Sequence, residues 1–174
     1  NTKDIKIKNC KITNMLGVGI DVSNSTYVEI DKNELDNITG QGIQFLFSNH
    51  CRCVNNVVRN ALHGIQWWGG DSASVTTQGI QDLIISNNII KNTTGGIWGS
   101  CGKNIIVSNN TVENSLDVGI DFEGCINCQA NNNIVIDSTH GGLACFYGSN
   151  NITFNGNNVI QNLYDSPCFK IFIG

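Results

Sequence analysis

A repeat of about 23 residues constrains the fold of this chain more than any other feature of its sequence. A glycine followed by an aliphatic residue recurs at spacings of 23, 22, 32, 23 and 23 residues. These pairs are Gly19-Ile20, Gly42-Ile43, Gly64-Ile65, Gly96-Ile97, Gly119-Ile120 and Gly142-Leu143. Asparagines recur in phase with them, each after a short alternating apolar run, at Asn9, Asn33, Asn56, Asn88, Asn110, Asn133 and Asn157. A period of roughly 20 to 30 residues predicts a solenoid whose units stack on one another.

Each repeat unit is predicted to consist of short strands and turns. The 174 residues include 19 glycines and one proline in a background rich in Asn, Val and Ile, which suits strands joined by tight turns and suits helices poorly. The recurring asparagine tolerates the left-handed backbone of a tight corner, and its amide can bond the same group in the coils above and below. We therefore expect an all-β chain.

The Asn-Asn-x-[Ile/Val] turns and the Gly-Ile-Asp-Phe strand resemble the right-handed parallel β-helix of the pectate-lyase-like superfamily. The resemblance covers about the full chain. It implies a single-stranded solenoid of about seven coils of ~23 residues, folded as one domain over residues 1–174. Because the chain begins at Asn1 rather than at a methionine, we expect it to be part of a longer protein.

The 32-residue spacing and the eight cysteines mark the departures from regularity. The long spacing predicts an insertion of about ten residues within 69–79, and insertions in solenoids often border the binding face. Cys125 and Cys128 form the only C-x-x-C pair, without a second pair or a histidine cluster, so we expect no metal and no cofactor. The repeat aligns Cys51, Cys128 and Cys145 with apolar positions, which predicts mostly reduced, buried thiols.

Charge and hydropathy argue against two classes of partner. Lys and Arg number 10 against 14 Asp and Glu, for a net charge of -4, and no basic cluster is present, so we expect no binding to nucleic acid. No apolar run approaches the roughly 20 residues that span a bilayer, so we expect no membrane insertion.

Stacking would bring equivalent residues of successive coils side by side, about 4.8 Å apart, on the outer surface. Two positions after each repeat glycine the ladder reads Asp21, Gln44, Gln66, Trp98, Asp121 and Ala144, and four positions after it reads Ser23, Leu46, Trp68, Ser100, Glu123 and Phe146. Exposed aromatic faces beside planar polar groups are typical of sugar binding. We therefore predict that Trp68, Trp98, Gln44, Gln66, Phe146 and His140 bind substrate. A subunit contact is an equal alternative for Trp98.

Asp121 and Glu123 are the predicted catalytic pair. Two residues apart on one strand, they should share a face with Cβ atoms about 6.6 to 7 Å apart, which fits an inverting glycoside hydrolase. Glu123, beside Phe146, is the expected general acid, and Asp121 the expected base. Asp117 should lie one coil from His140 and orient it or pair with it, and Asp71 could close over the cleft. The alternative is that these acids only face solvent.

The histidines and two further segments complete the functional prediction. We expect His63 and His140 to be turn residues rather than catalysts. The segments Asp117–Cys125 and Gly64–Asp71 are most similar to bacteriophage tailspike depolymerases. That resemblance implies a homotrimer on the virion tail, folded in the host cytoplasm, that cleaves a bacterial capsular or surface polysaccharide outside the host cell.

Two other functions stay open. A polysaccharide lyase or epimerase on the same fold would need a calcium-binding acid cluster or a basic side chain facing the groove, and Arg52 and Arg59 are predicted to lie away from the acids. A non-catalytic, glycan-binding adhesin would need neither.

Overall fold

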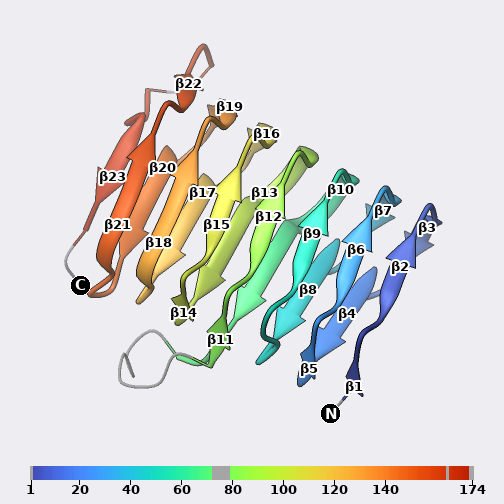
Figure 1. The fold of residues 1–174 in the computed structure, drawn as a ribbon. Coiled ribbons are helices and arrows are strands. Elements are labelled where there is room, and N and C mark those ends of the chain that lie inside the picture. The colour runs from blue at the N-terminus through green and yellow to red at the C-terminus, as the bar shows by residue number, and fades with distance from the viewer. Residues whose placement is uncertain (1, 72–78, 164, 173–174) are drawn as a thin grey trace.

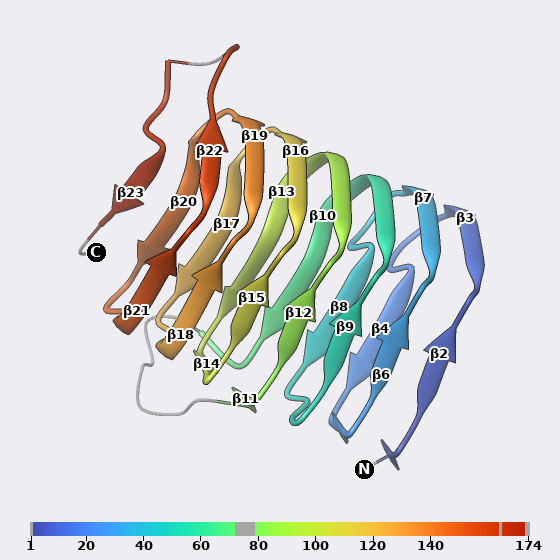
Figure 2. The same cartoon turned by 45° about the horizontal axis from the view of Figure 1, so that its top comes forward.

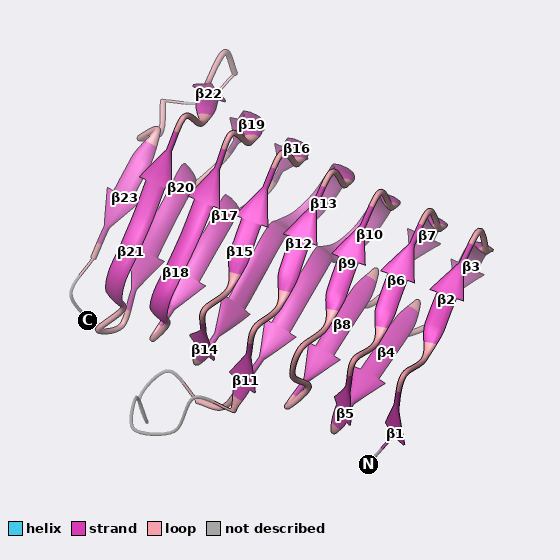
Figure 3. Ribbon diagram, in the orientation of Figure 1, coloured by secondary structure: helices cyan, strands magenta, loops and turns pink. Residues whose placement is uncertain are grey.

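The structure is a computed structural model that describes residues 2–71, 79–163 and 165–172. Within these ranges every element is a β-strand, and the strands wind into a solenoid whose successive coils lie side by side from one end to the other (Figure 1, Figure 3). The pairing between coils is parallel. The predicted all-β, parallel solenoid of about seven coils is confirmed. Three faces can be followed along it (Figure 2).

The first face is a nine-stranded sheet with one strand for each of seven coils. Two short strands complete it, one paired with the other and the second paired with the start of a longer strand. Its strands are β2 (Lys6–Lys8), β6 (Glu29–Asp31), β9 (Arg52–Val54), β12 (Ile84–Ser86), β15 (Ile106–Ser108), β18 (Ile126–Asn131) and β21 (Asn150–Asn155), with β11 (Ile80–Gln81) and β14 (Gly102–Lys103). A separate two-stranded sheet joins β1 (Thr2–Lys3) to β5 (Ser25–Thr26).

The second and third faces belong to one twelve-stranded sheet. The second face contains β3 (Lys11–Met15), β7 (Glu34–Ile38), β16 (Thr111–Ser115), β19 (Ile134–Ser138), β22 (Asn158–Ile160) and the first halves of β10 (Val57–Trp68) and β13 (Ile89–Ser100). The third face contains β4 (Ile20–Ser23), β8 (Ile43–Leu46), the second halves of β10 and β13, β17 (Val118–Glu123), β20 (Gly141–Phe146) and β23 (Phe169–Ile171). The long strands β10 and β13 therefore turn the corner between the two faces.

The interior is filled by inward ladders of apolar side chains. On the third face, Trp67, Gly99 and Phe122 are in register, and the Trp67 and Phe122 rings lie 5.6 Å apart. A Cβ atom on Gly99 would lie 1.9 Å from Trp67 Cδ2, so glycine is needed where the indole crosses the neighbouring coil. The aligned cysteines occupy inward positions too: Cys51 and Cys128 are buried and Cys145 is partly buried, and all eight cysteines are free thiols.

A ladder of asparagines, buried except for the half-buried Asn157 at its end, follows the first corner. The Nδ2 of Asn56 donates to Asn88 Oδ1 at 3.0 Å, and the same bond recurs along the ladder, whose members are Asn33, Asn56, Asn88, Asn110, Asn133 and Asn157. Each acceptor oxygen also takes a backbone N–H of the previous coil. These bonds satisfy polar groups that water cannot reach.

Two details of the asparagine prediction were wrong. The left-handed residue is the one before each ladder asparagine, such as Asn55 at φ 58° or Asn109 at φ 56°. The sequence analysis assigned the left-handed turn and the ladder hydrogen bond to one asparagine, whereas two adjacent residues have these roles. Asn9 is left-handed and is equivalent to Lys32, and the ladder position in the first coil is Cys10, whose backbone N–H donates to Asn33 Oδ1.

Candidate functional site

Strand β17 places the predicted acids on the outer side of the third face. Asp121 is in register with Trp98 of β13 and Ala144 of β20. Glu123 is in register with Ser100 and Phe146 of the same strands. Both outward ladders thus have the register that the repeat predicted.

Two adjacent hollows meet at β17, and together we call them the acid groove. They share Asp117, Val118, Asp121 and Glu123. The C-terminal hollow has a volume of about 310 Å³ and is also lined by His140, Phe146, Tyr147, Lys170 and Phe172. The N-terminal hollow has a volume of about 230 Å³ and is also lined by His63, Gly95 and Trp98. The acids therefore lie between two spaces, each with aromatic side chains.

Asp121 lines both hollows but is 5% exposed. The pKa of its carboxyl is raised to about 8, mainly by burial and also by the Glu123 and Asp117 carboxylates, while Lys170 lowers it. Its Oδ1 is buried and has no hydrogen-bond partner within the described part of the chain. Asp121 is therefore mostly protonated at pH 7.

Glu123 is half-buried and also has a raised pKa. Burial is the main cause, Asp117 adds to it, and a hydrogen bond from Trp98 opposes it. The larger shift thus belongs to Asp121, and the environments favour Asp121 as the proton donor and Glu123 as the base. This order reverses the predicted roles, because the fold buries Asp121 between Trp98 and Ala144 of the neighbouring coils.

The predicted contact between Asp117 and His140 is present. His140 Nδ1 lies 3.0 Å from Asp117 Oδ1, and both side chains are more than half exposed. His140 lies in the turn before β20, as expected, but His63 lies within β10, so its assignment to a turn was wrong. His63 Nδ1 is 3.0 Å from Gln66 Oε1, and its ring lies 5.3 Å from that of Trp98.

The predicted sugar-binding residues divide into two groups. Trp68 and Trp98 are half-buried with rings 5.9 Å apart, and Trp98 and Phe146 line the acid groove. Gln44 and Gln66 are 9% and 6% exposed, and their amides contact Asp21 and His63. The expectation of exposed aromatic faces was therefore wrong, since Trp68, Trp98 and Phe146 are all half-buried, and the glutamine amides are engaged by Asp21 of the same ladder and by His63 of the same strand.

Asp71 is exposed and does not line the acid groove. Its carbonyl oxygen accepts a hydrogen bond from Cys101 Sγ at 3.1 Å, beyond the end of β13. Residues 72–78 of the insertion lie outside the described residues. Closure of Asp71 over the cleft stays a prediction.

The sequence analysis missed Lys170, Tyr147 and Phe172. Lys170 is the next member of the Asp121 ladder after Ala144, and its Nζ lies 5.5 Å from the centre of the Phe146 ring. The last coil was hard to recognise in the sequence because Cys168 occupies the position of the repeat glycine. Its carbonyl oxygen accepts the Leu143 N–H, as the carbonyl of Gly42 accepts the Ile20 N–H in an earlier coil. Arg52 lies on the first face and Arg59 pairs with Glu34 on the second, so both are away from the acids as predicted.

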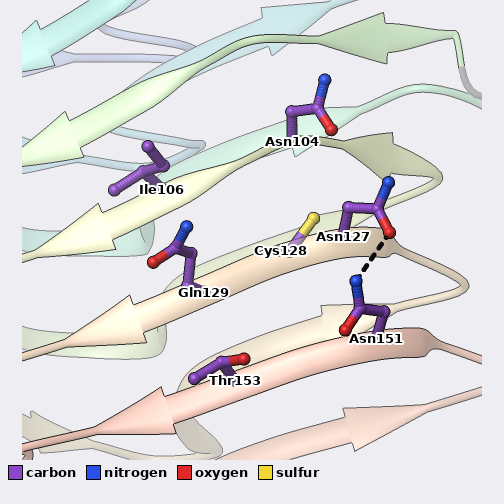
Figure 4. A pocket seen from close by; sticks show the side chains of 7 residues that line it. All are labelled: Asn104, Ile106, Asn127, Cys128, Gln129, Asn151 and Thr153. Atoms are coloured by element: carbon purple, nitrogen blue, oxygen red, sulfur yellow. Dashed lines mark hydrogen bonds between the residues drawn. The ribbon is translucent and has the colours of Figure 1, made fainter.

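A third hollow lies on the first face, at a distance from the acids (Figure 4). It has a volume of about 330 Å³ and is lined by Asn104, Ile106, Asn127, Cys128, Gln129, Asn151 and Thr153. Its lining offers side-chain amide and hydroxyl groups for hydrogen bonds, together with the Cys128 thiol.

Across residues 2–71, 79–163 and 165–172, no three His, Cys, Asp or Glu side chains are grouped so as to hold a metal ion. In the same ranges, no helix has the length and apolarity needed to cross a membrane.

Comparison with known proteins defines the class. The sequence matches the family described as "Right handed beta helix region" over residues 1–80 and 73–166, so the chain belongs to this family. It is 26% identical over 115 residues to the uncharacterized protein YclG of Bacillus subtilis (strain 168). The matched region covers 63% of this chain and 18% of YclG.

Two solved structures share the fold. The periplasmic alginate epimerase AlgG, in its T265N mutant, has a TM-score of 0.75 at 14% identity over 99% of this chain and 46% of its own. The Streptococcus pneumoniae surface protein and adhesin PfbA has a TM-score of 0.68 at 15% identity over 99% of this chain and 49% of its own. The chain thus spans less than half the length of each relative.

Proposed function

We propose that this protein is a glycoside hydrolase that binds a polysaccharide along the acid groove and cleaves it at Asp121. The observation that carries the proposal is a carboxyl group with a pKa of about 8 next to the carboxyl group of Glu123, in a groove with aromatic side chains on both sides. Glycoside hydrolysis requires such a pair, one group protonated and the other ionised at the working pH.

The reaction follows from the positions of the two groups. Asp121 gives its proton to the glycosidic oxygen as the bond from that oxygen to the anomeric carbon breaks. Glu123 takes a proton from the water that attacks the anomeric carbon, so that one water is consumed for each bond cleaved. The Cβ atoms of two residues that are two apart on one strand are about 6.6 to 7 Å apart, and carboxyl groups at a similar separation favour inversion.

The comparisons support a polysaccharide substrate. AlgG is described as an alginate epimerase, so a solenoid of similar shape acts on a polysaccharide in that protein. We propose a bacterial capsular or surface polysaccharide here, and a homotrimer of the tailspike type, on the resemblance of the β17 segment. Light scattering of the purified protein tests the trimer, and a monomeric mass would contradict it.

The hydrolase proposal is tested by product analysis. Incubation with purified capsular polysaccharides should release new reducing ends without ultraviolet absorbance from an unsaturated uronate. Asp121→Asn and Glu123→Gln should each reduce the rate by at least about a hundredfold. Asp21→Asn, which changes an exposed acid in the same ladder four coils away, is the matched control and should retain activity. Full activity of both groove variants would refute the site, and binding without cleavage would indicate an adhesin.

Lys170 favours a second candidate, a polysaccharide lyase or epimerase. Lys170 lines the C-terminal hollow with His140, and the neutral amine of Lys170 or the neutral imidazole of His140 would take the proton on the carbon next to a uronate carboxylate. In a lyase the bond from C4 to the glycosidic oxygen then breaks as the C4–C5 double bond forms, and the leaving oxygen takes a proton from water; in an epimerase a proton returns to the opposite face of the same carbon. In either reaction the protonated Asp121 would hydrogen-bond to the carboxylate. Unsaturated products, or epimerised products without cleavage, together with their loss in Lys170→Met, would establish this candidate over the hydrolase.

A further inference from the structure

Three aromatic side chains form the outer part of the C-terminal hollow. Phe146, Tyr147 and Phe172 line it, with ring centres 6.0 Å apart for Phe146 and Tyr147 and 6.3 Å apart for Phe146 and Phe172. Tyr147 is 45% exposed, so its ring is available to a molecule in the hollow. Asp121 lines the same hollow.

The backbone at Tyr147 is unfavourable for a tyrosine. Its φ is 53°, in the left-handed region that side chains other than glycine and asparagine rarely adopt. Equivalent corners of other coils contain Asn24 at φ 47° and Gly124 at φ 55°, residues that tolerate this conformation, and Phe47 at φ 46° and Cys101 at φ 49°, which share the strain. Strained residues are retained where the surrounding structure requires them, and they cluster at ligand sites.

We propose that Tyr147 binds the face of a sugar ring in the C-terminal hollow, and that the chain accepts a strained backbone at this residue to place the ring there. This inference rests on the proposed function. An aromatic ring offers a flat apolar face to the C–H groups of a sugar, and the phenol can bond a hydroxyl. The sugar would occupy the hollow on the C-terminal side of Asp121.

Two substitutions at Tyr147 separate the ring from the strain. Tyr147→Asn removes the ring and relieves the backbone, so it should raise Tm by a few degrees and weaken polysaccharide binding about tenfold. Tyr147→Phe keeps the ring face and should bind within about twofold of the parent.

Tyr27 provides the matched control. It is also left-handed, at φ 57°, and 55% exposed, but it stacks on His50 and does not line the acid groove. Equivalent residues Asn104 and Asn127 show that asparagine suits this corner. Tyr27→Asn should therefore raise Tm without changing binding.

Binding is measured by affinity electrophoresis in gels that contain sodium alginate, polygalacturonate, hyaluronate or dextran, with all proteins carrying Asp121→Asn so that the polymer stays intact. Retardation that falls in Tyr147→Asn alone supports the inference. Equal retardation of the parent and Tyr147→Asn overturns the inference and leaves the proposed function standing. A lower Tm in Tyr147→Asn with a higher Tm in Tyr27→Asn overturns it as well, because Tyr147 would then be a packing residue. No retardation of the parent in any gel counts against the proposed function itself and removes the basis of the inference.

Discussion

Replacing Asp121 with asparagine should make the protein more stable at neutral pH while it abolishes turnover. The carboxyl has a pKa of about 8 in the folded chain against 3.8 for an unperturbed aspartate. Between these two values the unfolded chain is ionised and the folded chain holds the proton. The folded state therefore binds more protons, and its stability falls as the pH rises through this window.

The magnitude follows from the width of the window. Each pH unit between the two pKa values changes the free energy of unfolding by about 1.4 kcal/mol. From about pH 4 to pH 7 the wild-type protein should thus lose about 4 kcal/mol relative to Asp121→Asn, which has no proton to hold. This is a large part of the 5 to 15 kcal/mol, roughly, that stabilises an ordinary domain.

Urea unfolding at pH 4, 5.5, 7 and 8.5 measures the effect as the difference between the two proteins. That difference should grow up to about pH 8 and then level off. Asp4→Asn, which changes an exposed carboxyl outside the groove, is the control and should show no such growth. Parallel stability profiles for the wild type and Asp121→Asn between pH 4 and pH 8 would refute the raised pKa and, with it, the assignment of the proton donor.

Further predictions follow from the same geometry. Hydrolysis should slow above about pH 8, where Asp121 loses the proton that it donates. It should also slow in acid, where Glu123 becomes protonated, and this loss should begin at a higher pH than for an ordinary glutamate with a pKa of 4.5. A flat rate profile from pH 4 to 9 would exclude this pair. Gly99→Ala should lower the free energy of unfolding by about 1 to 3 kcal/mol through its clash with Trp67, and Trp67→Phe should recover part of that loss in the double variant. Asn110→Ala leaves buried N–H groups without an acceptor and should cost about 2 kcal/mol in urea unfolding, whereas the exposed Asn150→Ala should change stability by less than about 0.5 kcal/mol.

The repeat predicted the fold well because its spacing determines which residues lie side by side. The spacing of the repeat glycines predicted that Trp98 lies beside Asp121 and Glu123 beside Phe146, and the register of the strands confirms both. The spacing of the asparagines was less informative about the role of each residue. In pairs such as Asn55 and Asn56, adjacent identical residues conceal the fact that one turns the backbone and the other forms the ladder.

The environment of the acids could not be predicted to the same degree. Alternation along a strand correctly put Asp121 on the outer side, but its burial depends on side chains of other coils. Lys170 escaped detection for a related reason, since the coil that carries it lacks the glycine that marks the others. Ladder positions are a property of the repeat, whereas exposure and pKa depend on the sizes of particular neighbours.

The asparagine ladder has a direction. From Asn33 to Asn133 each side-chain amide donates one Nδ2–H to the Oδ1 of the asparagine in the next coil and the other to a main-chain carbonyl of the preceding coil, so the bonds between asparagines all run toward the C-terminus. The amide dipoles therefore add along the solenoid axis, and each bond polarises the next. The two ends of the ladder therefore differ: toward the first coil an amide oxygen accepts the Cys10 N–H, whereas in the last coil the amide group of Asn157 donates back to Ala130.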